Sequence, residues 1–339
     1  MEFFADYLGF LAKTATLVVA FLIVLAALAS LRGKGRRKGG QLQVHKLNDF
    51  YKQLRERLEA TLMDKDALKR HRKQQAKADK AKKKQKEAPA RVFVLDFEGD
   101  IKASATESLR QEITALLTVA TPKDEVVVRL ESGGGMVHSY GLASSQLARV
   151  RQAGVPLTVC VDKVAASGGY MMACIGEKIL CAPFAVLGSI GVVAQLPNIH
   201  KLLRKHDIDV ELHTAGEYKR TLTVLGENTE KGREKFQEDL EITHKLFKNF
   251  VVHYRPQLSI EEVATGEVWL GVSALEKQLV DEIKTSDEYL AERAKAAQVF
   301  HLHFAERKSL QERVGIAAGL AAEGALGRVW AILSGRYPL

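Results

Sequence analysis

The hydrophobic pattern of the chain is most regular between residues 91 and 161, where short apolar runs alternate with amphipathic stretches. Short apolar runs bounded by turn residues are typical of buried strands, and apolar positions three or four apart predict helices. The predicted strands cover residues 91–97, 126–130 and 155–161, and the predicted helices cover residues 106–119 and 137–152. Strands that alternate with helices predict a parallel α/β core.

The pattern continues less regularly beyond residue 161. Residues 170–179, rich in Ala and Met, predict a further helix, and residues 230–253 predict a long charged one. Residues 179–195 are almost apolar enough for a membrane span, but Pro183 and the glycines favour buried strands. Residues 269–281 predict a strand, a helix and a short strand that close the domain.

The N-terminal region has a different pattern. Residues 14–31 are an uninterrupted run of apolar and small residues, which would rise about 27 Å as a helix and so nearly match a bilayer core. A cleaved signal peptide is the alternative, because residues 27–29 are small, yet Glu2 and Asp6 precede a lone Lys13 where a cationic segment is required. We therefore expect a retained transmembrane anchor.

The segment after the anchor is strongly basic. Residues 32–88 hold 20 Lys and Arg against 7 Asp and Glu, a balance of +13, so the net charge of +9 leaves −4 for the rest of the chain. Residues 44–62 carry a helical apolar stripe, and residues 65–87 predict a solvated helix or a disordered tether. We interpret the segment as a spacer attracted to anionic lipid; a nucleic-acid arm is disfavoured because no aromatic residues lie between the lysines.

Two predicted strands end in glycine turns that precede helices, at residues 131–135 (ESGGG) and 163–170 (KVAASGGY). The carboxyl ends of parallel strands gather at one edge of a sheet, so the two turns are expected to face one another. Ser167 lies in the second turn, where a strand gives way to a helix. Alone, it fits a helix N-cap better than a nucleophile.

Four motifs in a fixed order favour the interpretation of Ser167 as a nucleophile. LESGGGMV, AASGGY, GSIGV and AGEYK follow one another across some 90 residues. This set resembles the signal peptide peptidase A family of membrane serine proteases, whose fold is like that of Clp protease and crotonase, a core of repeated ββα units. The anchor, the basic spacer and the single-length protease domain are most similar to one branch of that family.

The resemblance implies a Ser-Lys dyad. Ser167 would be the nucleophile, Lys219, 52 positions later, the general base, and Ser189 the residue that orients the lysine amine. A lysine takes a proton only when neutral, and its ordinary pKa is near 10.4, so the fold or the substrate must desolvate Lys219.

The resemblance also implies an oxyanion hole. Its donors would be the N–H of Gly168 and that of Gly135, with Gly134 as the alternative. The family usually has Ser-Pro-Gly-Gly where this chain has Ser132 followed by Gly133. Loss of the proline should loosen the turn, which leaves the donor glycine open.

Other functions remain open at this stage. A Ser-His mechanism would use His138, His200 or His213, but no Asp lies in a comparable motif. A crotonase-like acyl-CoA enzyme would share the fold without the dyad, and an inactive membrane scaffold would use only the spacer and the tail. The three cysteines, an odd set in apolar surroundings, argue against a disulfide framework.

The expected organisation is an anchor at residues 1–31, a spacer at 32–89, a peptidase domain at 90–300 and an amphipathic or oligomerisation tail at 301–339. We expect a peptide or protein substrate, a homo-oligomer by analogy with ring-forming relatives, no nucleic acid, no metal and no cofactor. The expected location is a bacterial inner membrane, spanned once. RGKGRRKGG favours a cytoplasmic body by the positive-inside rule, whereas the resemblance favours the periplasmic side.

Overall fold

The structure is a computed structural model that describes residues 10, 13–14, 40–71, 73–74 and 90–306. The chain divides into two compact units, Leu42–Phe304 and a second one made of Met1–Gln41 with Ala305–Leu339. Nearly all described residues belong to the first unit, which contains the catalytic candidates.

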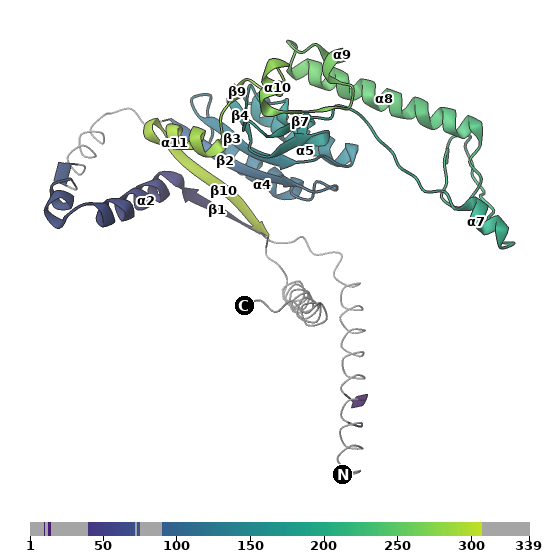
Figure 1. Ribbon diagram of the computed structural model, residues 1–339, viewed down its shortest axis with the longest axis horizontal. Coiled ribbons are helices and arrows are strands. Elements are labelled where there is room, and N and C mark those ends of the chain that lie inside the picture. Colours follow the sequence, from purple (N-terminus) through teal and green to yellow (C-terminus); the bar gives the residue numbers. More distant parts are fainter. Residues whose placement is uncertain (1–9, 11–12, 15–39, 72, 75–89, 307–339) are drawn as a thin grey trace, which may run out of the picture. The chain divides into compact units, whose positions relative to one another are not determined.

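A ten-stranded sheet forms the centre of the described structure (Figure 1). Along its main path lie β1 (Gly40–Lys46), β10 (Gln298–Glu306), β2 (Arg91–Gly99), β3 (Glu125–Ser132), β4 (Leu157–Val161), β6 (Lys178–Cys181) and β9 (Glu282–Ile283). From β10 to β9 every pairing is parallel, as the alternation of strands and helices predicts. The prediction of an α/β core is confirmed.

Three short strands leave this path near the end of β3: β5 (Val164–Ala166), β7 (Val186–Gly188) and β8 (Val268–Leu270). β5 pairs with β3 through Ser132 and Ala165, and with β7 along its whole length. β7 pairs antiparallel with β8. The chain therefore turns out of the main sheet beside the glycine turn that follows β3.

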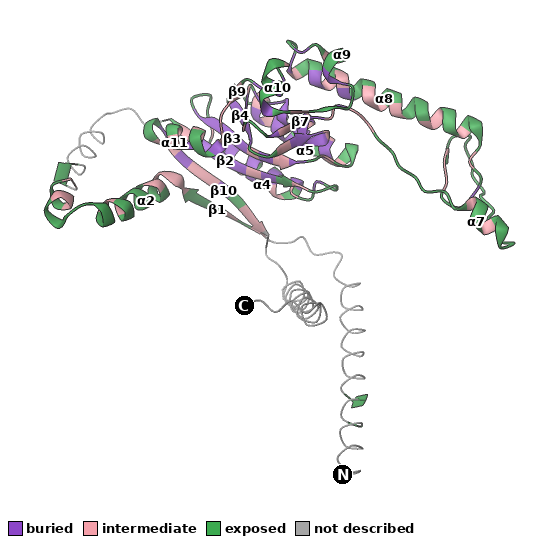
Figure 2. Cartoon of the chain, in the orientation of Figure 1, coloured by how far each residue is buried: buried purple, intermediate pink, exposed green. Residues whose placement is uncertain are grey.

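The described helices include α2 (Leu47–Leu62), α4 (Thr106–Leu117), α5 (Val137–Gln152), α6 (Gly168–Ala173), α7 (His200–Lys205), α8 (Glu230–Tyr254), α9 (Ile260–Val263), α10 (Gly271–Glu276) and α11 (Ser286–Ala296). Successive residues of β2 bury opposite faces: Phe93 and Leu95 join a large core with α4, α5 and α6, whereas Val92 and Val94 pack beside Leu290 of α11. Because both faces are covered, β2 is apolar almost throughout rather than at alternate positions. Figure 2 shows this burial concentrated in β2, β3 and β4, and exposure along α2, α7 and much of α8.

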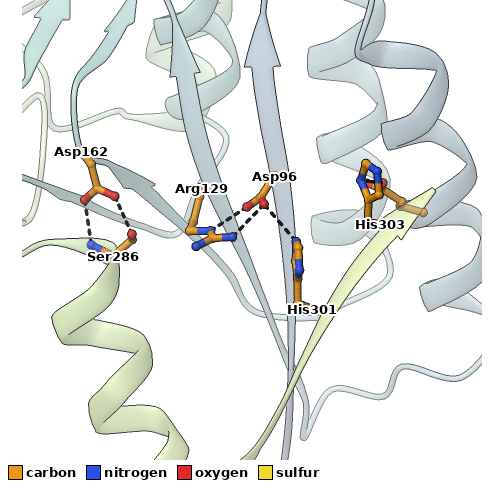
Figure 3. A network of polar contacts seen from close by, with 7 residues as sticks. Asp96, Arg129, Asp162, Ser286, His301 and His303 are labelled. Atoms are coloured by element: carbon orange, nitrogen blue, oxygen red, sulfur yellow. Dashed lines mark hydrogen bonds and ion pairs between the residues drawn. The ribbon is translucent and has the colours of Figure 1, made fainter. Parts of the chain in front are cut away.

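Towards the ends of the strands the α11 face of the sheet becomes polar (Figure 3). Asp96 accepts hydrogen bonds from Arg129, its register partner on β3, and from His301 of β10. Burial alone would raise the pKa of Asp96, but the bonds from His301 and Arg129 lower it to about 2. Asp162 accepts from the N–H and hydroxyl of Ser286 and so fixes the start of α11 to the end of β4.

Two predicted helices end or begin elsewhere. The helix predicted over residues 170–179 is wrong in its second half, because residues from Lys178 onward pair with β4 as strand β6. The helix predicted from residue 44 starts at Leu47, since the preceding residues belong to β1. Strand β10 runs to Glu306, across the predicted boundary between the peptidase domain and the tail.

The predicted membrane anchor at residues 14–31 lies outside the described residues except for Thr14, as does the tail beyond residue 306. Within the described part of the chain, no helix has the length and apolar character needed to cross a bilayer.

Candidate active site

Ser167 lies on a tight turn between β5 and α6. Its φ of +53° is rare for a residue with a side chain, costs about 1–2 kcal/mol and persists only where the surroundings enforce it. Here the Ser167 N–H donates to the carbonyl of Gly188 at 2.8 Å, and the Ser167 carbonyl accepts from the N–H of Met171 at 3.0 Å. Ser167 occupies the N-cap position, but its hydroxyl makes no capping hydrogen bond. The hydroxyl is left available for chemistry.

The glycine turn after β3 touches the Ser167 turn. Gly134 has a φ of +89°, and a Cβ built on it would lie 2.7 Å from the nitrogen of Gly168 and 2.8 Å from the Cβ of Ser167. Only glycine allows this approach. The expectation that the two turns face one another agrees with this contact.

Hydrogen bonds distinguish the N–H groups of the two turns. The N–H of Gly134 donates to the Ser132 hydroxyl at 3.0 Å, and that hydroxyl also bonds the buried Tyr140 hydroxyl. By contrast, the N–H groups of Gly135 and Gly168 make no hydrogen bond with any residue that the structure describes. These two donors are therefore free for a ligand.

Two cavities meet at Ser167 and share Gly135, Gly191, Val192 and Val193. The first, of about 720 Å³, contains the predicted Ser189 and is here named the polar cavity after Gln237, Glu241 and His244 in its wall. The second, of about 470 Å³, has an apolar wall made by Tyr140, Met171, Leu246, Phe247 and Phe250. A chain lying across Ser167 would place different side chains in the two cavities.

Ser189 lies directly after β7 and has a φ of +51°. Its N–H donates to the carbonyl of Glu267 at 2.6 Å. The sequence-predicted Ser189, Gly134 and Gly135 are thus brought together with Ser167 around the polar cavity.

The fold does not bring Lys219 into the polar cavity around Ser167. It lies exposed in the segment between β7 and α8, where its N–H donates to the carbonyl of Gly216 at 3.1 Å. It lines neither cavity that contains Ser167. Figure 1 follows this segment from β7 through α7 to α8.

The histidines weighed from the sequence do not line these cavities either. His138 is exposed on α5, and His213 is exposed beside Glu211. The sequence interpretation missed His244 of α8, which lines the polar cavity with Gln237 and Glu241. Positions 237, 241 and 244 share one face of a helix, but the helical pattern does not say that this face meets the site.

Cys160, Cys174 and Cys181 are unpaired and fully buried. Burial raises the pKa of the Cys160 thiol to about 12 and that of Cys181 to about 11. Among the described residues, no group of three or more His, Cys, Asp or Glu side chains has an arrangement that could hold a metal ion.

Two family models match almost the whole chain. The model described as Peptidase family S49 N-terminal matches residues 2–147, and the model described as Peptidase family S49 matches residues 149–300.

Curated relatives extend this likeness. The chain is 50% identical over 323 residues to the probable protease SohB of Haemophilus influenzae, covering 90% of each protein. It is 47% identical over 306 residues to the probable protease SohB of Buchnera aphidicola subsp. Schlechtendalia chinensis, covering 86% of this chain and 100% of that one. A more distant likeness, 26% identity over 167 residues, joins it to the putative signal peptide peptidase SppA of Enterococcus faecium, over 49% of this chain and 48% of the relative.

Proposed function

The chain belongs to peptidase family S49 and is on that ground a protease, and we propose that it is a membrane-anchored serine endopeptidase that acts through Ser167. The observation that carries this proposal is the contact between the Ser167 turn and the glycine turn at Gly134. The proposal is supported by the position of Ser167 in both cavities and by the two glycines with unbonded N–H groups, Gly135 and Gly168, that line the apolar cavity with it.

In the proposed reaction the Ser167 Oγ gives its proton to the general base and attacks a peptide carbonyl. The C–N bond then breaks, the amine leaves with that proton, and water hydrolyses the acyl-enzyme. The developing oxyanion is stabilised by the N–H of Gly168 and the N–H of Gly135. Gly135 is the better second donor, because the N–H of Gly134 is already bonded to Ser132.

Lys219 is the proposed general base, with Ser189 orienting its amine. Because Lys219 is exposed and outside both cavities of its own chain, we propose that a second copy of the chain supplies it. Entry into the polar cavity beside Ser189 would remove water from the ammonium and so favour the neutral amine that a base requires. The active site is then complete only in a homo-oligomer.

Mixing two inactive variants tests the dyad and its arrangement. We expect Ser167→Ala and Lys219→Ala each to lower kcat by about 10⁴-fold or more against a fluorogenic peptide. Co-assembled, the two variants should regain part of the activity, because a site can combine Ser167 from one copy with Lys219 from the other. Full activity of either single variant would refute the dyad, and a mixture that stays inactive would refute the shared site.

The substrate proposed is a membrane-associated peptide, such as a signal-peptide remnant, with an apolar side chain beside the scissile bond. The apolar cavity lined by Met171, Phe247 and Phe250 supports this choice. Cleavage of a peptide library by the wild-type protein, with Ser167→Ala as the blank, would show apolar enrichment on one side of the cut. Equal cleavage of charged and apolar peptides would contradict it.

The membrane location rests on residues 14–31 and the basic residues that follow them. We propose a single-pass protein of the bacterial inner membrane with the peptidase domain on the cytoplasmic side. A C-terminal reporter that is active only outside the membrane would overturn that orientation. For the core, we propose the Clp protease and crotonase type of fold, supported by the branch of β5, β7 and β8 from the main sheet.

A further inference from the structure

The segment from Gly188 to Gly191 is joined directly to the Ser167 turn. The carbonyl of Gly188 accepts the hydrogen bond from the Ser167 N–H, and β7, which ends at Gly188, pairs with β5. Ser189 and Gly191 both line the polar cavity beside Ser167. A shift of this segment would therefore move both the nucleophile and the cavity wall.

The backbone of this segment is strained. Gly188 has a φ of +96°, which glycine adopts freely, whereas the φ of +51° at Ser189 is costly for a residue with a side chain. A Cβ on Gly188 would also lie 2.7 Å from the ring of Trp269. A conformation of this kind persists only where neighbouring groups hold it.

Besides the bond from the Ser167 N–H to Gly188, three hydrogen bonds hold it here. Two come from the main chain: the N–H of Ser189 donates to Glu267, and the N–H of Gly191 donates back to the carbonyl of Ser189. The third comes from His244, whose Nε2 lies 3.1 Å from the carbonyl oxygen of Ile190. Within the described part of the chain, it is the one side-chain hydrogen bond to residues 188–191.

The hydrogen bond to the Ile190 carbonyl determines which atom of the His244 ring carries a proton. A carbonyl oxygen only accepts hydrogen bonds, so Nε2 of His244 must carry a proton and donate it. The ring is partly buried on α8, a 25-residue helix whose C-terminal part is anchored by the buried residues Phe247 and Val251. His244 thus ties the strained segment to the part of α8 that lies next to its buried residues.

We propose that His244 is a positioning residue of the active site, which holds the Ile190 carbonyl and thereby sets the place of Ser189 and Ser167. This inference rests on the proposed function of Ser167 and adds a residue to it. Among the described residues no hydrogen bond joins His244 to Ser167, and the proposed action of the imidazole is through the segment.

Two substitutions separate the hydrogen bond from the volume of the ring. His244→Phe keeps a planar ring but removes the donor, whereas His244→Gln keeps an N–H donor on a side chain of similar length. The matched control is His253→Ala, an exposed histidine on the same helix that contacts the Tyr254 ring and lines neither cavity. The full-length protein is assayed with a fluorogenic peptide, together with labelling of Ser167 by a fluorophosphonate probe.

We expect His244→Phe to lower kcat and the labelling rate by about 10- to 100-fold with little change in KM, as misplacement of a reacting group does. His244→Gln should recover most of the loss, and His253→Ala should match the wild type. Wild-type kcat in His244→Phe would overturn the inference. So would a failure of His244→Gln to recover kcat, because an N–H donor at this position would then not be enough and the imidazole itself would take part in the reaction.

The proposed function of Ser167 and the proposed role of His244 are refuted by different results. Peptide cleavage that survives in Ser167→Ala would refute the role of Ser167 whatever the His244 variants do. Thermal unfolding of each variant reports on the fold: if His244→Phe and His244→Gln unfold alike but differ in kcat, stability does not explain the difference.

Discussion

Gly134 and Ser167 are packed so closely that a methyl group on Gly134 would lie 2.8 Å from the Cβ of Ser167. This contact joins the turn after β3 to the turn after β5. The glycine turn therefore forms one wall of the site. Replacing one hydrogen atom of Gly134 by a methyl group is enough to disturb that site.

Gly134→Ala is expected to lower kcat/KM by about 100-fold, because the methyl group must displace Ser167 or the Gly168 N–H. The positive φ of Gly134 adds strain, so we also expect the free energy of unfolding to fall by about 1–3 kcal/mol. Peptide hydrolysis and urea unfolding measure the two effects. Gly133→Ala is the control, since a Cβ there meets no atom within 4 Å; equal activity losses in both variants would contradict the contact.

Tyr140→Phe tests the support of the glycine turn. The Tyr140 hydroxyl donates to the carbonyl of Asp100 at 2.8 Å and bonds the Ser132 hydroxyl, which in turn accepts from Gly134. Its loss leaves buried polar groups unpaired, so stability should fall by about 1–2 kcal/mol. The ring that packs on Gly168 is kept, so any fall in kcat comes from the hydroxyl.

Tyr254→Phe is the matched control for that experiment. The Tyr254 hydroxyl makes no hydrogen bond with a described residue, whereas its ring packs against Phe250 at an interplanar angle of 58°. A Tyr140→Phe protein as stable and active as Tyr254→Phe would show that the hydroxyl network does not support the turn.

Arg255→Leu is expected to be among the most damaging single changes outside the site. Arg255 is buried, donates to both carboxylate oxygens of Asp281 at 2.8 and 2.9 Å, and donates to the carbonyl of Gln278. Asp281 is exposed and keeps its hydrogen bond from the Ile179 N–H, so the cost is that of the lost charge-assisted hydrogen bonds, about 1.5–3 kcal/mol. Denaturant unfolding measures this; Arg233→Leu, at the exposed start of α8, should change stability by less than about 0.5 kcal/mol.

Glu112 gives stability an unusual dependence on pH. Burial raises its pKa to about 7, even though the N–H of Phe304 donates to its carboxylate. Between the ordinary pKa of about 4.3 and pH 7, the folded state therefore binds more protons than the unfolded state, so stability falls as the pH rises through this window. The slope from this one group reaches about 1.4 kcal/mol per pH unit.

Glu112→Gln removes the titration but keeps an acceptor for the Phe304 N–H. Urea unfolding at pH 5, 6, 7 and 8 should show the wild type losing stability relative to this variant up to pH 7 and no further change above it. Parallel curves for the two proteins would show that Glu112 is ionised throughout.

Much of the sheet was predictable because its signals are local. The helix predicted at residues 137–152 coincides with α5, and the strand predicted at 91–97 extends by only two residues. The strand β1 was missed because its partner β10 lies some 250 residues away in sequence, and no local pattern reveals such a pairing. For the same reason the helix was predicted to begin at Val44 instead of Leu47.

The same distinction between local signals and contacts of distant segments applies to the residues of the candidate site. Ser167, Gly134 and Ser189 lie in short motifs next to strand ends, and the parallel topology brings strand ends together. His244 was missed because a helix face meets the site only through tertiary packing. The pairing of Ser167 with Lys219 stays a prediction, because within one chain the structure places the lysine outside the cavities.

The burial of all three cysteines makes the protein ready for site-specific spectroscopy. Cys160, Cys174 and Cys181 are shielded from solvent with raised thiol pKa values, so they will react slowly with maleimide dyes. A cysteine introduced at the exposed position of Val193 would become the single fast-labelling site without removal of any native thiol. A fluorophore there would report, in real time, the arrival of a peptide or of a neighbouring subunit at Ser167.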